Sequence, residues 1–308
     1  MISKNYVKYL FLYSLSVIWI KDACYSQYSS SISLSSFPIE KRKKPKNSMA
    51  KGTGFIYWGY NRSAYSRSTI NFEGVGYNFA LKGVQATDRP SKKISEYFDP
   101  TKWTVPQFNV RVGYNFKNYW NISIGYDHMK YVMIHGPQYL LNGKINEGVD
   151  PNWSGNYDDE LVITNEKDFH YENSNGMNYI RLELSNVKNL VRNGRDNFTL
   201  SYLLGLSSGA ILSINDFNFG NQKDMATMSL SGLGVSGHAG VRFEFFKHIF
   251  LQTNVGVGFL RQMNVRTRNN EYNSFARQSI GYIEGNIVLG ALLYLRPTNS
   301  CDSCPVWH

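Results

Sequence analysis

The sequence lacks three features: a long apolar run after residue 20, a second pair of cysteines, and an excess of charge over most of its length. The first absence bears on membrane crossing, because a transmembrane helix needs roughly 20 consecutive apolar residues. If this chain spans a membrane, it therefore does so with strands rather than helices.

The net charge of +10 is concentrated near the N-terminus. Residues 1–51 hold 9 Lys and Arg against 2 Asp and Glu, which leaves 24 basic and 21 acidic residues in the remainder. A near-balanced body is poor support for nucleic-acid binding, and we expect no nucleic-acid partner. The basic run at 40–46 suits either a solvated tail or contact with anionic lipid headgroups.

The first 26 residues have the pattern of a secretory signal peptide. Lys4 and Lys8 precede a short apolar core, and small residues favour cleavage before Gln27. Lipidation at Cys24 is the alternative reading. Residues 27–51, which are Ser-rich and then basic, are predicted to be a linker.

The other two cysteines, Cys301 and Cys304, lie in a short tail at residues 297–308. A Cys-x-x-Cys pair serves as a redox couple, as half of a zinc site or as a small disulfide. Without a second pair or a thioredoxin-like context, we expect a disulfide, as is usual in an oxidising compartment. No metal site and no cofactor is predicted.

What the chain does have is alternation of apolar and polar residues. Residues 233–295 contain three runs with a period of two, separated by a tight turn and a polar loop. Each run is about a dozen residues or longer, beyond the usual five or six of globular strands and enough for a tilted strand to cross a bilayer. Aromatic residues make up 15% of the chain, as expected where rings girdle two membrane interfaces.

Short turns and long loops alternate along residues 52–296. The tight turns are expected at 117–119, 193–196 and 247–248, and the long loops at 88–105, 135–176 and 215–232. If all short turns lie on one side of the membrane, the first strand begins and the last strand ends on that side only when the number of strands is even. Residues 53–87 must then supply three strands, which predicts an all-β, closed antiparallel transmembrane β-barrel of about ten strands. Eight or twelve strands also fit the pattern.

The last strand, residues 286–295, carries Gly290 followed by Leu293 and Leu295. This pattern is similar to the assembly signal of outer-membrane β-barrel proteins of Gram-negative bacteria, which the chain resembles over residues 53–295. The departure is that thirteen residues follow Leu295, where such barrels usually end on an aromatic residue. The resemblance implies location in the outer membrane, contact with its lipid and insertion by the barrel-assembly machinery. It implies no particular activity.

With the apolar faces turned to lipid, charged side chains of both signs point into the lumen. A barrel of eight to ten strands is narrow enough for side chains to fill, so buried charges are tolerated only when they pair. We expect a salt-bridged, mostly plugged lumen; a small-solute channel is the alternative. The lumen charge network is predicted to comprise Lys82, Arg111, Asp127, Arg181, Glu183, Arg242, Glu244 and Glu284.

Two further features bear on function. His238 faces the lumen two residues from Ser236, which makes these two the weak catalytic candidates for an outer-membrane hydrolase acting on lipid or peptide. The segment 135–176 is rich in acidic residues but lacks the spacing of a Ca²⁺ loop. Its aromatic residues are predicted to form an exposed surface that binds an extracellular protein or glycan; they are Trp153, Tyr157, Phe169 and Tyr171. The favoured function is therefore binding or surface assembly through the outside loops, and an enzyme is the less favoured reading.

Overall fold

The computed structural model describes residues 47–91, 93, 95–99, 106–193 and 197–295. The predicted signal peptide, most of the linker, the turn at 194–196 and the tail with Cys301 and Cys304 lie outside these residues, so those assignments stay predictions. No helix in the described part of the chain is long and apolar enough to cross a membrane. The elements are β1 (Thr53–Tyr65), β2 (Ser68–Gly74), β3 (Tyr77–Val84), β4 (Ala86–Thr87), α2 (Ser95–Phe98), β5 (Phe108–Lys117), β6 (Trp120–Met133), β7 (Gln138–Ile145), β8 (Gly155–Ile163), β9 (His170–Arg192), β10 (Phe198–Phe219), β11 (Gln222–Phe245), β12 (Ile249–Arg266) and β13 (Phe275–Tyr294).

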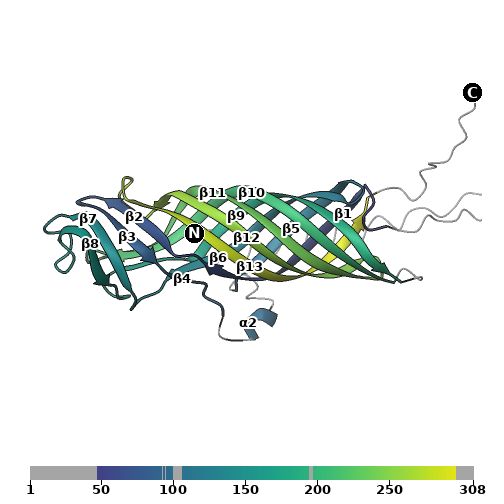
Figure 1. Cartoon of the computed structure of the whole chain (residues 1–308), viewed down its shortest axis with the longest axis horizontal. Coiled ribbons are helices and arrows are strands. Elements are labelled where there is room, and N and C mark those ends of the chain that lie inside the picture. Colours follow the sequence, from purple (N-terminus) through teal and green to yellow (C-terminus); the bar gives the residue numbers. More distant parts are fainter. Residues whose placement is uncertain (1–46, 92, 94, 100–105, 194–196, 296–308) are drawn as a thin grey trace, which may run out of the picture. The chain divides into compact units, whose positions relative to one another are not determined.

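Eight of these strands close into a ring. Each pairs antiparallel with the next in the order β1, β5, β6, β9, β10, β11, β12, β13, and β13 pairs back with β1. The ring is visible as the long barrel in Figure 1. The prediction of a closed antiparallel barrel is confirmed, with eight strands in the ring instead of the favoured ten.

The difference in strand number arises at the start of the barrel. Residues 53–87 do supply three substantial strands, but only β1 joins the ring. β2 and β3 have seven and eight residues, fewer than the 9–11 that a tilted strand needs to cross a bilayer. β2 pairs instead with the first residues of β13, Phe275 to Gln278, and β3 pairs with β7.

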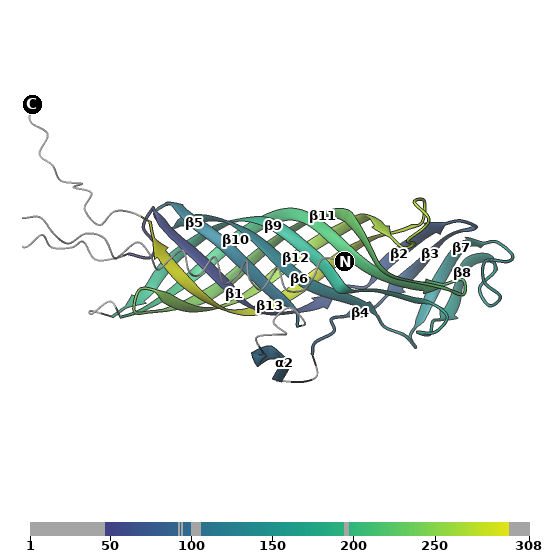
Figure 2. The ribbon, with the colours of Figure 1, turned by 180° about the vertical axis from the view of Figure 1, so that it is seen from behind.

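The two ends of the ring differ. At one end, which we call the turn end, Thr53 pairs with Tyr294 and the short turns β5–β6 and β11–β12 return the chain. At the other end the sheet continues through β2, β3, β7 and β8, together with the adjoining parts of β6 and of β9–β13 (Figures 1 and 2). We call this continuation the extension.

Two segments predicted to be long loops are largely strands of the extension. The segment 135–176 contains β7, β8 and the start of β9, and 215–232 contains the ends of β10 and β11. The prediction failed because the apolar residues of these strands are widely spaced and mixed with acids. β10 and β11 are joined by a two-residue turn at Gly220 and Asn221, both with positive φ (66° and 54°), as tight hairpin turns require.

The outer wall of the ring is apolar over its whole circumference. Outward side chains expose large fractions of their area, for example 71% for Leu206, 61% for Val255 and 63% for Ile287. Aromatic residues gather on this wall at the turn end, where Phe116, Tyr119, Trp120, Phe245 and Phe246 are exposed. Such a wall, which we call the apolar belt, is stable only in contact with hydrocarbon.

Candidate functional site

The centre of the ring is filled by paired charges. Arg111 on β5 donates to both oxygens of Asp127 on β6, with Nη1 to Oδ1 at 2.6 Å and Nη2 to Oδ2 at 2.9 Å. The Nε atom of Arg181 on β9 lies 2.9 Å from the same Oδ2. The side chains of Arg111 and Asp127 are fully buried, so each guanidinium offsets the cost of burying the shared carboxylate.

Two glutamates complete this cluster. Glu183 Oε2 lies 3.5 Å from Arg111 Nε, and Glu284 Oε1 lies 3.8 Å from Arg181 Nη2. Asn286 donates to Glu284 over 3.1 Å. Five of the eight residues predicted to line the lumen therefore meet at one level of the barrel.

Arg242 and Glu244 are also buried inside the ring, on β11. Arg242 donates from Nε to Gln252 Oε1 at 2.7 Å, and its guanidinium carbon lies 4.3 Å from the centre of the Phe250 ring. A cation over an aromatic face is stabilised by the ring quadrupole. This layer thus holds its arginine by an amide and an aromatic face, unlike the carboxylate layer around Asp127.

The eighth predicted lumen residue, Lys82, lies elsewhere. It belongs to β3 in the extension, is 40% exposed, and pairs with Asp159 of β8 at 2.6 Å. The prediction that Lys82 points into the lumen is wrong because β3 is not part of the ring, so its polar face meets solvent.

Gly125 is a part of this site that sequence reasoning did not single out. A Cβ atom at this position would lie 2.2 Å from Arg111 Nη1, because the arginine side chain lies directly over the glycine. The only signal in the sequence was a glycine at an inward position between Ser123 and Asp127. Glycine here makes the room that the buried guanidinium needs.

His238 projects into the lumen from β11, as predicted, and is buried. Its Nε2 lies 3.5 Å from Glu183 Oε1 and 3.5 Å from Ser185 Oγ. Ser236, its proposed partner, is instead engaged by Arg181 Nη1 at 2.9 Å and by Ser207 Oγ at 2.6 Å. The structure therefore does not bring Ser236 and His238 together as a nucleophile and its base.

The space beside His238 is too small for a substrate. The cavity lined by Tyr57, His238 and Tyr282 measures about 10 Å³, which is about the room for one water molecule. A second cavity nearer the turn end, beside Glu244, has the same volume. Along the described residues, the polar lumen is therefore packed with side chains, as the charge pattern predicts.

Of the four aromatic residues predicted to form an exposed binding surface, three are core residues and Tyr157 is half-buried. Phe169 and Tyr171 have no exposed area, Trp153 is 8% exposed, and Tyr157 packs against the same cluster. Phe169 contacts Trp153 edge-on, with ring centres 5.6 Å apart. The prediction of exposure is wrong because the segment folds onto the sheet of the extension, where the strand residue Tyr171 and the turn residues Trp153 and Phe169 join one buried cluster.

The core of the extension is dry and rich in aromatic rings. Phe72 of β2 stacks on Phe217 of β10 at 5.2 Å, and Phe219 packs against Phe79 at 5.3 Å. The cluster continues over the ring to Tyr179 and Tyr282. The lumen is thus closed over its charged layers by a layer of buried aromatic and aliphatic side chains.

The acidic residues of the segment 135–176 have structural roles where they are buried. Asp150 accepts hydrogen bonds from the backbone of Asn152 and Trp153, and from Gly220 across the sheet. Glu172 pairs with Arg89 at 3.0 Å and with His170 at 3.0 Å. Among the described residues, no group of three metal-ligating side chains converges.

No family model matches the chain. No curated protein matches it either. Among solved structures, it is similar to Ail, the attachment invasion locus protein of Yersinia pestis, seen in complex with the heparin analogue sucrose octasulfate (10% identity, 79% of this chain and 99% of that chain, TM-score 0.31). It is also similar to the outer membrane protein OprG of Pseudomonas aeruginosa (10%, 81% and 100%, 0.37) and the outer membrane protease OmpT of Escherichia coli (8%, 78% and 96%, 0.31). The likeness to these structures is one of fold, a closed antiparallel β-ring with an apolar outer wall and a polar lumen.

Proposed function

We propose that the protein is exported by its N-terminal signal peptide, inserts into the outer membrane, and presents the extension at the cell surface as a binding or surface-assembly module. The orientation follows the rule for such barrels, in which short turns face the periplasm and the longer connections face outside. The short turns β5–β6 and β11–β12 lie at the turn end, and at the opposite end the strands of the ring continue into the extension.

One observation carries this proposal: the extension has its own buried core and ends in a strand with a free edge. Among the described strands, β8 pairs only with β7. Leu161 and Ile163 on β8 are 65% and 59% exposed. A free strand edge with exposed apolar side chains is how many proteins bind an extended segment of a partner.

The chemistry of β8 favours a protein partner over a glycan. Of the four aromatic residues predicted to contact a sugar, Trp153, Phe169 and Tyr171 are buried in the core of the extension and Tyr157 is half-buried. Asp158, Asp159 and Glu160 lie on the same strand and are exposed. Charges on an edge strand discourage pairing with another copy of the same edge, so they select for a partner segment that carries basic residues.

The two alternatives have less support. A channel needs a continuous aqueous path, whereas the lumen holds buried ion pairs and cavities of about 10 Å³. A hydrolase at His238 needs room for substrate and an available nucleophile, and Ser236 is bonded elsewhere. The packed lumen supports a role for the outer surface of the protein, and the free edge of β8 is the part of that surface that this proposal uses.

Site-specific photocrosslinking in the intact membrane tests the proposal. A photoreactive residue at Leu161 or Ile163 is expected to give a discrete protein adduct in cells that make the protein. The same residue at Leu206, in the apolar belt, is expected to give lipid adducts, and at the exposed Lys144 of β7 no discrete adduct. Adducts at Lys144 equal to those at Leu161, or none at either β8 position, would contradict binding at the free edge.

Conductance in planar bilayers provides the second arm. The purified protein is expected to leave the bilayer non-conducting, because its ion pairs and aromatic layers fill the lumen. Steady single-channel currents from the folded protein would favour the channel instead.

A further inference from the structure

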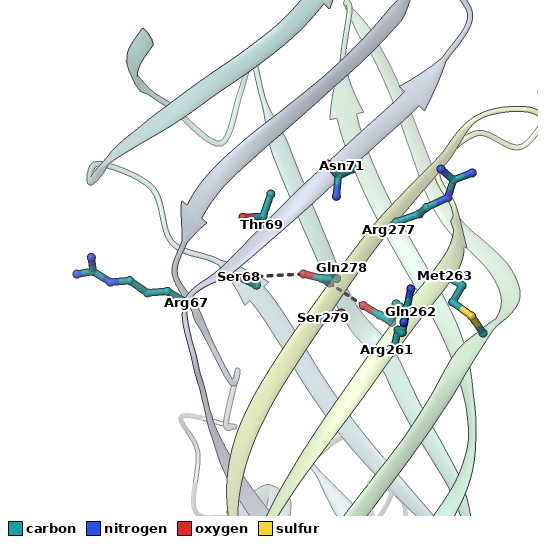
Figure 3. Close-up of a pocket in the computed structure, with 10 residues that line it drawn as sticks. All are labelled: Arg67, Ser68, Thr69, Asn71, Arg261, Gln262, Met263, Arg277, Gln278 and Ser279. Atoms are coloured by element: carbon teal, nitrogen blue, oxygen red, sulfur yellow. Dashed lines mark hydrogen bonds between the residues drawn. The ribbon is translucent and has the colours of Figure 1, made fainter. Parts of the chain in front are cut away.

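A groove of about 610 Å³ lies on the outer wall of the barrel, where the start of β2 meets β13 and β12 (Figure 3). Its lining comes from two distant parts of the chain, and the residues are Arg67, Ser68, Thr69, Asn71, Arg261, Gln262, Met263, Arg277, Gln278 and Ser279. It is distinct from the lumen and from the free edge of β8.

A mismatch between neighbouring strands produces the groove. Tyr65 on β1 pairs with Tyr282, and Ile70 on β2 pairs with Gln278, so four residues (66–69) oppose three (279–281) on β13. The extra residue bends the chain away from β13, as a bulge does. Ser66 holds the bend to the strand through two hydrogen bonds with Gly281, of 2.8 and 3.0 Å.

The floor of the groove is closed from within. Gln278 Nε2 donates to Gln262 Oε1 at 2.6 Å, and Ser68 Oγ donates to Gln278 Oε1 at 3.3 Å (Figure 3). These three residues are buried and lie inside the barrel wall. The groove is therefore a preformed surface site and does not lead into the lumen.

Arginine dominates the groove. Arg277 lies 3.4 Å from Glu73 at an exposed position, where such a pair is worth little. Arg261 has no acidic partner within salt-bridge distance among the described residues. Arg67 borders the groove, but its side chain points away from Arg261 and Arg277 (Figure 3). Guanidinium groups bind phosphate oxygens in a bidentate way, and Asn71 and Thr69 add neutral donors at the same place.

The groove adjoins the apolar belt. On β12, Phe259 faces outward at 47% exposure, Arg261 is the next outward residue, and Met263 follows at 46% exposure. Arg261 pairs with Leu233 of β11, which is 60% exposed on the same wall. A molecule that occupies the groove therefore has hydrocarbon-facing surface directly beside it.

We propose that this groove binds the phosphate-bearing headgroup of a lipid in the leaflet that surrounds the belt. Arg261 and Arg277 pair with the phosphate, and Met263 and Phe259 contact the adjoining acyl region. Continuity with the belt favours a lipid over a soluble phosphate. The proposal does not depend on what binds β8.

Native mass spectrometry of the detergent-solubilised full chain tests this site, with bisphosphorylated lipid A as the probe. The double variant Arg261→Gln and Arg277→Gln is expected to bind this lipid at least about tenfold more weakly than the parent, since one charge-assisted hydrogen bond accounts for that factor. Dephosphorylated lipid A is expected to bind parent and variant equally. The matched control Lys144→Gln and Lys223→Gln removes the same charge from exposed positions outside the groove and is expected to bind like the parent.

Folding of each variant is checked by heat-modifiable electrophoretic migration, and the variant with lysine at both arginine positions keeps the charge if the glutamine variant does not fold. It is expected to bind less tightly than the parent, because lysine lacks the planar fork. Equal binding of bisphosphorylated lipid by parent and glutamine variant would overturn the site. Displacement of lipid A by inorganic phosphate at an equal concentration would overturn the lipid as its occupant.

Discussion

The ring and the extension are built from the same strands but have opposite interiors. On β10 the odd-numbered residues face inward throughout: Ser201 and Ser207 in the ring, then Ile211, Phe217 and Phe219 in the extension, all buried. The outward residues change in the opposite sense, from exposed Leu204 and Leu206 to the polar Asn218.

This comparison shows that the surroundings, and not the strand itself, decide which face is polar. In the ring, hydrocarbon outside selects apolar outward residues, and the inward charges must pair with one another. In the extension, water outside allows polar outward residues such as Asn218 beside exposed apolar ones such as Leu161, and the interior becomes an ordinary aromatic core. On β10, the odd-numbered residues thus face inward in both regions, although the interior is polar in the ring and apolar in the extension.

The largest effect is expected from removing the shared carboxylate of the ring. Asp127→Ala leaves Arg111 and Arg181 buried without their main partner, which should lower the free energy of unfolding by about 3–5 kcal/mol. Urea titration of the refolded barrel in detergent measures it. Asp158→Ala, at an exposed position on β8, should change stability by less than about 0.5 kcal/mol. Equal losses in the two variants would show that the charge layer is not what stabilises the ring.

A comparable loss, confined to the extension, is expected from opening its core. Phe217→Ala removes a buried ring stacked on Phe72, which typically costs about 3–5 kcal/mol. Limited proteolysis should then cut within β7 and β8 while the ring stays protected in the membrane. Simultaneous loss of the ring would mean that the two regions unfold as one cooperative unit.

A matched pair of substitutions sharpens the contrast between the outer walls. Leu206→Arg places a charge against hydrocarbon and should cost about 2–4 kcal/mol if the residue lies near the middle of the bilayer. Leu161→Arg, on the exposed face of β8, should change stability by less than about 0.5 kcal/mol. Equal tolerance of both changes in a folding titration would remove the distinction between belt and extension.

The smallest effect is expected from pH, and only in the extension. Burial and the neighbouring His170 hold the pKa of His135 below the usual 6.5, and its Nε2 lies 2.7 Å from His170 Nδ1. The unfolded chain therefore binds more protons than the folded one below about pH 6.5, so the stability present above that value is lost as pH falls. Proteolysis of β7 and β8 should accelerate between pH 7 and 5, and less so in His135→Gln. An identical acceleration in that variant would assign the effect to other groups.

Much of the ring was predictable from the sequence, because alternation at period two is a strong signal where a strand faces lipid on one side. The alternation correctly predicted which charged side chains point into the lumen and meet there, among them Arg111, Asp127, Arg181 and Glu183. Their exact partners were not predictable, since pairing across the barrel depends on strand order and register.

The extension was not predictable by the same reasoning. Its strands are short or carry adjacent charges, as in Asp158, Asp159 and Glu160, so the alternation is blurred. Lys82 was misplaced because a strand rule suited to lipid was applied where water is outside. Phe169 was misplaced because the segment 135–176 was interpreted as a long exposed loop. The groove at Arg261 and Arg277 was missed because it depends on the one-residue mismatch where β2 meets β13, and no local pattern reveals it.

The seam between β1 and β13 joins a strand made early in synthesis to the one made last. The strands between them, including the short strands of the extension, must pair before β1 and β13 can pair and close the barrel. Contacts so far apart along the chain are slow to form. Until they form, the open sheet has two unpaired edge strands, which can pair with the edge strands of other chains and aggregate. The order in which the chain is made thus gives the late β13 strand control over when the cylinder is finished.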